Sequence, residues 1–125
     1  MTRTIDVPAT AAEARERVDA LLHTCHRPVD EAVVMDALLI TSELVTNALR
    51  HAGGLTGFAV RITGGRLKVT VEDASPVRPS LPGDDRAGRI GGYGWPLVRR
   101  LATAVAITPT ADGKGKGIHV ALRLW

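Results

Sequence analysis

The chain has 125 residues, 45% of them hydrophobic and 3% aromatic, and 16 Lys and Arg against 13 Asp and Glu give a net charge of +3. This length supports one hydrophobic core and excludes two ordinary domains, so residues 1–125 are predicted to form a single domain. The basic residues are scattered, and few aromatic residues are available to stack on bases. These features suit an anionic ligand and argue against nucleic acid.

Cysteine content and the N-terminus predict the compartment. Cys25, the single cysteine, cannot form an intramolecular disulfide, and no Cys/His cluster has the spacing of a zinc site. The first ten residues lack the apolar stretch of a signal peptide, and no window approaches the roughly 20 apolar residues that span a bilayer. We therefore expect a soluble cytoplasmic protein with no membrane partner.

The N-terminal part of the chain is predicted to be mainly helical. Alternation over residues 5–7 indicates a short opening strand, which Pro8 ends because it cannot donate to a ladder. A helix is expected from 11 to about 24, since Thr10 can cap it and apolar residues recur at helical spacing. A second helix is expected from about 30 to 52, where two glycines end it.

Beyond the second helix the apolar residues alternate, which is typical of strands. Runs at 58–62 and 67–71 flank a glycine turn and predict an antiparallel hairpin. Residues 74–94 are rich in proline and glycine, a composition typical of a lid or binding loop, and a third helix should follow to about 103. Closing strands are expected at 105–107 and 118–124. These elements predict an α+β two-layer sandwich, with about three helices on one face of a mixed or antiparallel sheet.

Three polar residues of the second helix form the first candidate site. Glu43, Asn47 and His51 are spaced four residues apart, so they project from one side of the helix. An asparagine carbonyl is a hard oxygen ligand for magnesium, and a carboxylate one turn away can accept a proton from an attacking hydroxyl. The alternative is a solvated polar stripe, which amphipathic helices commonly carry.

The second candidate is Asp73, which ends the apolar run of the hairpin just before the long loop. A buried aspartate at a strand end can accept a hydrogen bond from the exocyclic amine of adenine and so discriminate against guanine. The alternative is that Asp73 only starts a turn.

The third candidate is the glycine-rich segment 88–95, which precedes the third helix. Glycine lets the backbone approach phosphate oxygens, and free amides at a helix N-terminus favour negative charge. The segment does not match the P-loop pattern, and simple flexibility is the alternative. Arg86 and Arg89 are candidates to close on phosphate, or else stay solvated.

In order and spacing, these motifs resemble the GHKL ATPase superfamily, which includes gyrase, histidine kinases and the bacterial anti-sigma factor kinases. The resemblance covers almost the whole chain: residues 43–48 with 51–52 resemble the N box, Asp73 the adenine-reading residue of the G1 box, and residues 92–94 the G2 box. The size of the chain and the residues of its N-box motif are most similar to those of the small stand-alone anti-sigma kinase-like ATP-binding proteins of actinobacteria. A phospho-accepting dimerisation helix is missing, so a complete sensor histidine kinase is not expected.

The resemblance implies a Bergerat-type ATP-binding fold, with ATP and Mg²⁺ as cofactors and residues 75–90 as the ATP lid. The implied roles are catalytic base for Glu43, magnesium ligand for Asn47, adenine reader for Asp73, phosphate loop for Gly92 and Gly94, and phosphate contact for Arg89. The chain departs from the family at Ser75, Trp95 and Lys116, which replace a common glycine, leucine and threonine. Lys116 is predicted either to take over the phosphate contact of the threonine or to accompany a low nucleotide affinity.

The leading functional hypothesis is a serine/threonine kinase of the anti-sigma type, which phosphorylates a small anti-sigma factor antagonist and has a sigma factor as a further candidate partner. The second is a non-catalytic nucleotide-binding module that sequesters a regulatory partner. A basic nucleic-acid binder is third and would show salt-sensitive retention. The edge of the opening strand also makes a homodimer a candidate.

Overall fold

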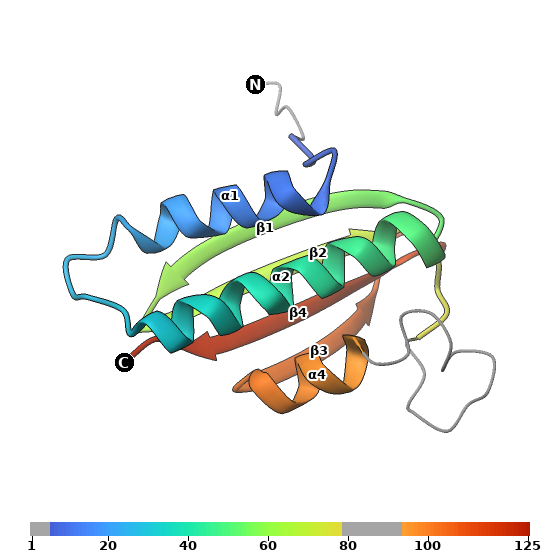
Figure 1. Ribbon diagram of the computed structural model, residues 1–125. Helices are drawn as coiled ribbons and strands as arrows, with labels where there is room; N and C mark the ends of the chain where they lie inside the picture. Colours follow the sequence, from blue (N-terminus) through green and yellow to red (C-terminus); the bar gives the residue numbers. More distant parts are fainter. Residues whose placement is uncertain (1–5, 79–93) are drawn as a thin grey trace.

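The computed structural model describes residues 6–78 and 94–125, which form two layers (Figure 1). The described helices are α1 (Ala11–Leu22), α2 (Glu31–His51) and α4 (Gly94–Leu101). The described strands are β1 (Leu55–Thr63), β2 (Arg66–Asp73), β3 (Ala104–Pro109) and β4 (Lys116–Arg123). All pairings in this part are antiparallel, in the order β1-β2-β4-β3, and the helices lie on one face. The predicted α+β sandwich is confirmed, with an antiparallel sheet.

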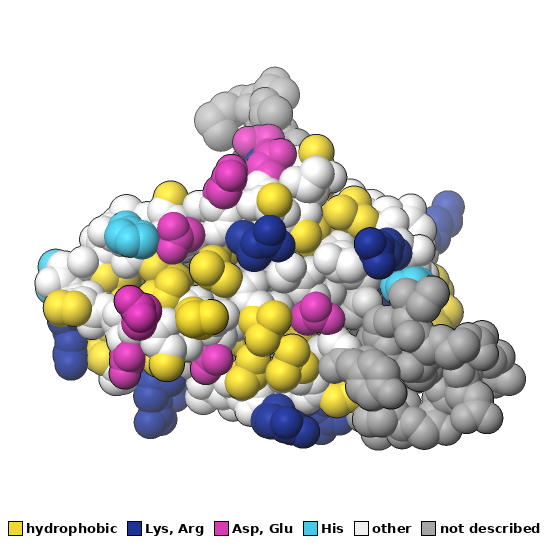
Figure 2. All heavy atoms as spheres, viewed as in Figure 1, with side chains coloured by type: hydrophobic (Ala, Val, Ile, Leu, Met, Phe, Trp, Pro, Cys, Tyr) yellow, Lys and Arg dark blue, Asp and Glu magenta, His cyan; other side chains and the backbone are white. Residues whose placement is uncertain are grey.

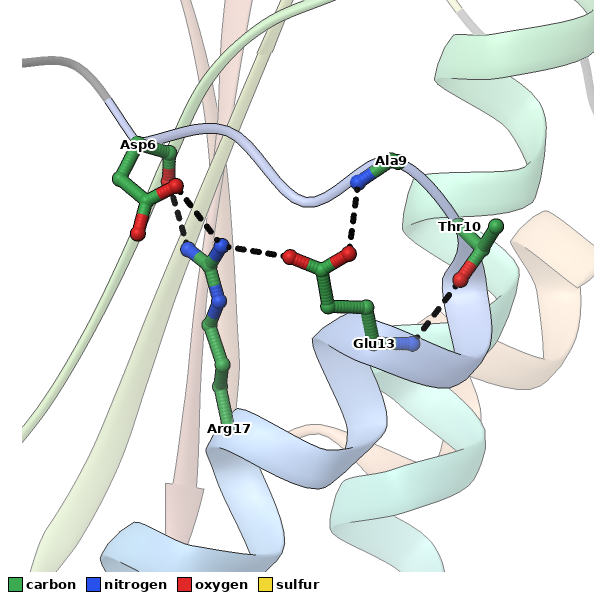
Figure 3. Close-up of polar contacts among 5 residues, drawn as sticks. All are labelled: Asp6, Ala9, Thr10, Glu13 and Arg17. Atoms are coloured by element: carbon green, nitrogen blue, oxygen red, sulfur yellow. Dashed lines mark hydrogen bonds and ion pairs between the residues drawn. The ribbon is translucent and has the colours of Figure 1, made fainter.

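The predicted opening strand is wrong where the structure describes it, because residues 6–8 form no strand; Ile5 lies outside the described residues. Arg17 of α1 holds this segment instead, donating to the Asp6 carbonyl at 2.5 Å and pairing with the Asp6 carboxylate at 3.2 Å (Figure 3). The same guanidinium lies 2.9 Å from Glu13. Residues 6–8 therefore follow the start of α1.

The start of α1 is capped by side chains, as the sequence predicts. Thr10 accepts a hydrogen bond from the Glu13 amide at 3.1 Å, and Glu13 accepts one from the Ala9 amide at 3.2 Å (Figure 3). The Ala9 amide, and then the Arg17 guanidinium, lower the pKa of the Glu13 carboxyl below its usual value. These contacts satisfy amides that have no partner within the helix.

The long helix α2 is the centre of the core. Its buried residues are Ala37, Ile40, Thr41, Leu44, Val45 and Ala48. The Thr41 hydroxyl donates back to the Ala37 carbonyl at 2.8 Å, so this polar group is satisfied inside the core. An 18-residue window of α2 has a mean hydropathy of 1.5, so length and composition alone would also suit a membrane span. The expectation that no window comes near this composition is thus wrong, because a helix that packs on a sheet and two helices is itself strongly apolar.

Side chains along the sheet alternate between the helix layer and the open face. In β2, Leu67, Val69 and Val71 are buried, while the intervening residues are partly exposed. The hairpin between β1 and β2 is confirmed, and its turn residues Gly64 and Gly65 have φ of 60° and 74°, as a tight two-residue hairpin turn requires. The third helix ends at Leu101, slightly before the predicted end at about residue 103. The two closing strands are confirmed.

Candidate functional site

The end of α2, the end of β2 and the start of β4 lie together at one end of the domain, on the right in Figure 1, and α4 packs against α2. The amide of Ala74 donates to the carbonyls of Ala52 and Gly54 at 3.1 and 3.2 Å, which ties the end of β2 to the end of α2. Asp73 is paired in register with Lys116, which joins β2 to β4. Asp73 and Lys116, which were predicted from separate motifs, are therefore joined at this end.

Asp73 forms a buried ion pair with Lys116. The Lys116 ammonium lies 3.1 Å from Oδ1 and 3.0 Å from Oδ2, and the two side chains are 6% and 3% exposed. Lys116 also donates to the Ser75 carbonyl at 3.1 Å, while the Ser75 amide donates to Asp73 Oδ1 at 2.9 Å. The ammonium thus donates two hydrogen bonds, to Oδ1 and to the Ser75 carbonyl, in addition to its ion-pair contact with Oδ2. Lys116, predicted at the phosphates, lies instead on the carboxylate predicted to read the base.

Glu43 lies directly against the first residue of α4. A Cβ atom added to Gly94 would come within 2.0 Å of Glu43 Oε1, so only a glycine allows this carboxylate to rest there. Amides at a helix N-terminus favour a negative group by about 0.3–1 kcal/mol. The structure therefore brings the predicted base and the predicted phosphate-loop glycine together.

Asn47 is half-buried one turn further along α2, and His51 is exposed at its end. Both lie on the unbroken helix at the predicted spacing, so they follow Glu43 along one side. The described residues include no group of three or more His, Cys, Asp and Glu that could hold a metal ion. Mg²⁺ often takes one or two protein oxygens and completes its shell with water and phosphate, so Asn47 fits as a single ligand.

Gly115 is a site residue that sequence reasoning missed. A Cβ on it would lie 2.1 Å from the carbonyl oxygen of Asp73, so the turn before β4 packs directly on the end of β2. The turn is closed by Asp112, which accepts from the Lys114 amide at 2.9 Å and from the Thr110 hydroxyl at 2.7 Å. These hydrogen bonds, the first one most, lower the pKa of the Asp112 carboxyl. A glycine directly before Lys116 is the only trace of this contact in the sequence.

The remaining predictions fall partly beyond this geometry. Gly92, Arg86, Arg89 and most of the proposed lid lie outside the described residues. Trp95, one of the departures from the family, is 6% exposed and belongs to the core cluster. Its bulk therefore fills the space between α4 and the rest of the core.

Charge on the helical face agrees with the scattered pattern of the sequence. Figure 2 shows Lys and Arg side chains set apart from one another on this face, with acidic and hydrophobic side chains between them. Among the described residues, this face therefore presents no continuous basic patch of the kind that tracks a nucleic-acid backbone.

Comparisons with known proteins agree with this architecture. A family model described as the histidine kinase-like ATPase domain matches residues 6–123. The structure of the blue-light activated histidine kinase of Erythrobacter litoralis EL346 is 26% identical, with a TM-score of 0.51; the match covers 87% of this chain and 40% of that one. The histidine kinase domain of the same protein is 23% identical over 99% of this chain and 70% of that one, with a TM-score of 0.53. No curated protein sequence matches.

Proposed function

This chain belongs to the histidine kinase-like ATPase domain family, and we propose that it is an ATP-dependent protein serine/threonine kinase of the anti-sigma-factor type. It would transfer the γ-phosphoryl group of ATP to a serine hydroxyl on a small antagonist protein and release ADP. A sigma factor is a second candidate partner, and pairing of two copies stays a prediction. Because the chain spans 40% of the first similar structure, the kinase proposal depends on its own site residues.

The observation that carries the proposal is the contact between Glu43 and Gly94. It holds a carboxylate at the start of α4, where a helix N-terminus would face the phosphates. A base in that position can accept the proton of the attacking serine while the hydroxyl oxygen bonds to phosphorus. This contact therefore supports Glu43 as the base of a transfer reaction, in addition to nucleotide binding.

Asn47 and Asp73 supply the rest of the proposed site. The Asn47 amide oxygen would be the protein ligand of Mg²⁺, which when bound neutralises charge on the phosphates. Asp73, at the end of β2, would accept a hydrogen bond from the adenine ring of ATP. In such a reaction most of the catalysis comes from positioning and charge neutralisation, so a small set of residues suffices.

The test replaces Glu43 with glutamine, which keeps the size of the side chain and removes its basicity. We expect Glu43→Gln to bind Mg-ATP like the wild type in calorimetry and to transfer no label from γ-labelled ATP to candidate antagonist proteins. Glu31→Gln, an exposed position at the far end of α2, is the matched control and should leave transfer unchanged. Phosphoryl transfer by Glu43→Gln at the wild-type level would reject Glu43 as the catalytic base.

A non-catalytic binding module is the second candidate function, and the Asp73–Lys116 pair favours it. Lys116 already contacts the Asp73 carboxylate that would bind adenine, so nucleotide binding has to replace existing contacts. This candidate predicts that labelled ATP binds and that no partner becomes labelled. Asn47→Ala should remove the magnesium dependence of ATP binding under either function. If ATP affinity changes neither with magnesium nor with this substitution, the proposed nucleotide site is rejected.

A further inference from the structure

The base-reading end of the proposed nucleotide site contains a donor as well as an acceptor. Oδ1 of Asp73 accepts from the Ser75 amide and from Lys116, so both of its lone pairs are used. Oδ2 lies 3.0 Å from the Lys116 ammonium as the second oxygen of the ion pair, so it retains lone-pair capacity for a ligand. The Lys116 ammonium lies against that same oxygen. A base that reaches Oδ2 therefore also meets a cationic donor.

A carboxylate without such a neighbour discriminates between the purines. It can only accept hydrogen bonds, so it pairs with the 6-amino group of adenine. Guanine can donate N1–H to it, but the 6-oxo group of guanine is then a buried acceptor without a donor. One unsatisfied buried polar group costs about 1–3 kcal/mol, which corresponds to about 5- to 150-fold in affinity.

Lys116 changes this balance. Adenine can donate its 6-amino group to Oδ2 and accept from the ammonium at N1. Guanine can donate N1–H to Oδ2 and accept from the ammonium at O6. In both cases Lys116 donates to a base atom, while Asp73 Oδ1 keeps the Ser75 amide. Neither purine then leaves N1 or its 6-position group unpaired.

We propose that Lys116 is a specificity-determining residue, and that its pair with Asp73 makes the site accept guanine as well as adenine nucleotides. The inference rests on the proposed nucleotide site, because a chain without that site has no base to read. It assigns Lys116 to the base, whereas the resemblance to the family implied a contact with phosphate.

The experiment titrates the full chain by calorimetry with Mg-ATP, Mg-GTP and Mg-ITP. We expect Kd values for GTP and ITP within about fivefold of that for ATP, the lower limit of the cost of one unpaired acceptor. ITP has the 6-oxo and N1–H groups of GTP without the 2-amino group. If ITP alone falls within this limit, Lys116 pairs with the 6-oxo group but the 2-amino group of guanine is excluded, and the acceptance of guanine nucleotides is overturned. ATP binding with both 6-oxo nucleotides weaker than this limit overturns the inference and leaves the ATP site intact. Failure of all three nucleotides to bind overturns the proposed function as well.

Variants separate the role of the ammonium in base selection from a purely structural one. Lys116→Arg keeps a cationic donor and should keep the ATP to GTP ratio near that of the wild type. Lys116→Thr should raise the preference for ATP by about 5- to 150-fold. Lys114→Thr, in the exposed turn, is the control and should leave the ratio unchanged. Thermal unfolding checks that each variant is folded; if Lys116→Thr is not, the wild-type titrations decide. An unchanged ratio in a folded Lys116→Thr protein would contradict the proposal.

Discussion

Replacing Lys116 with methionine should destabilise the domain strongly. The substitution keeps the length of the side chain but leaves the Asp73 carboxylate, 3% exposed, without its cation. Removing one partner of a buried pair costs about 3–5 kcal/mol, against a total stability of about 5–15 kcal/mol for a domain. At about 3–5 °C per kcal/mol for a chain of this size, the melting temperature should fall by about 10–25 °C.

Urea unfolding followed by circular dichroism measures this loss. The matched control, Lys114→Met, changes an exposed lysine two residues away and should alter stability by less than about 0.5 kcal/mol. The double variant Asp73→Leu/Lys116→Met removes both charges and should recover to within about 1 kcal/mol of the wild type, because apolar replacements of a buried pair are often neutral. A loss below about 1 kcal/mol for Lys116→Met alone would show that water reaches the carboxylate, and would refute the reasoning.

Three further perturbations test other contacts. Gly115→Ala places a Cβ 2.1 Å from the Asp73 carbonyl, and because both groups are backbone it should cost about 3 kcal/mol in urea unfolding; a cost under about 1 kcal/mol would contradict the close packing. Thr10→Ala removes the cap of α1 and should cost about 1 kcal/mol in the same assay, whereas Thr10→Ser should not. The Lys114 amide lowers the pKa of Asp112, so this stabilisation is present at neutral pH and lost as the pH falls through the folded-state pKa. The stability gap between wild type and Asp112→Asn should therefore shrink in acid, and an equal gap at both pH values would argue against it.

Much of the fold follows from local patterns in the sequence. The end of α2 is marked by Gly53, whose φ of 74° suits the left-handed conformation after a helix. The hairpin follows from apolar alternation on both sides of a glycine pair, because this combination is typical of two strands joined by a tight turn. The prediction of an opening strand is wrong over residues 6–8 because alternation over a few residues is weak evidence for a strand. A guanidinium from α1, which the pattern does not reveal, decides the path of that segment.

The candidate site was predictable only where its residues share one element. Glu43 and Asn47 are related by helical spacing, and Asp73 ends an apolar strand, so each is visible locally. Lys116 is 43 residues from Asp73 along the chain, and their pairing depends on the register between β2 and β4. Contacts of the glycine at 115 likewise depend on backbone approach between distant segments. Sequence patterns describe neither kind of proximity.

That register is itself fixed by burial energy, which connects the core to the site. Leu67, Val69 and Val71 face the helices, and alternation places Asp73 on the same side, opposite Lys116. A slip of one residue would turn all three apolar side chains outward, at about 1.5–3 kcal/mol each, and bring Glu72 to the helix layer in place of Asp73. The summed penalty is about 4.5–9 kcal/mol, against about 3–5 kcal/mol for loss of a buried ion pair, so the apolar core of β2 determines which carboxylate meets the ammonium.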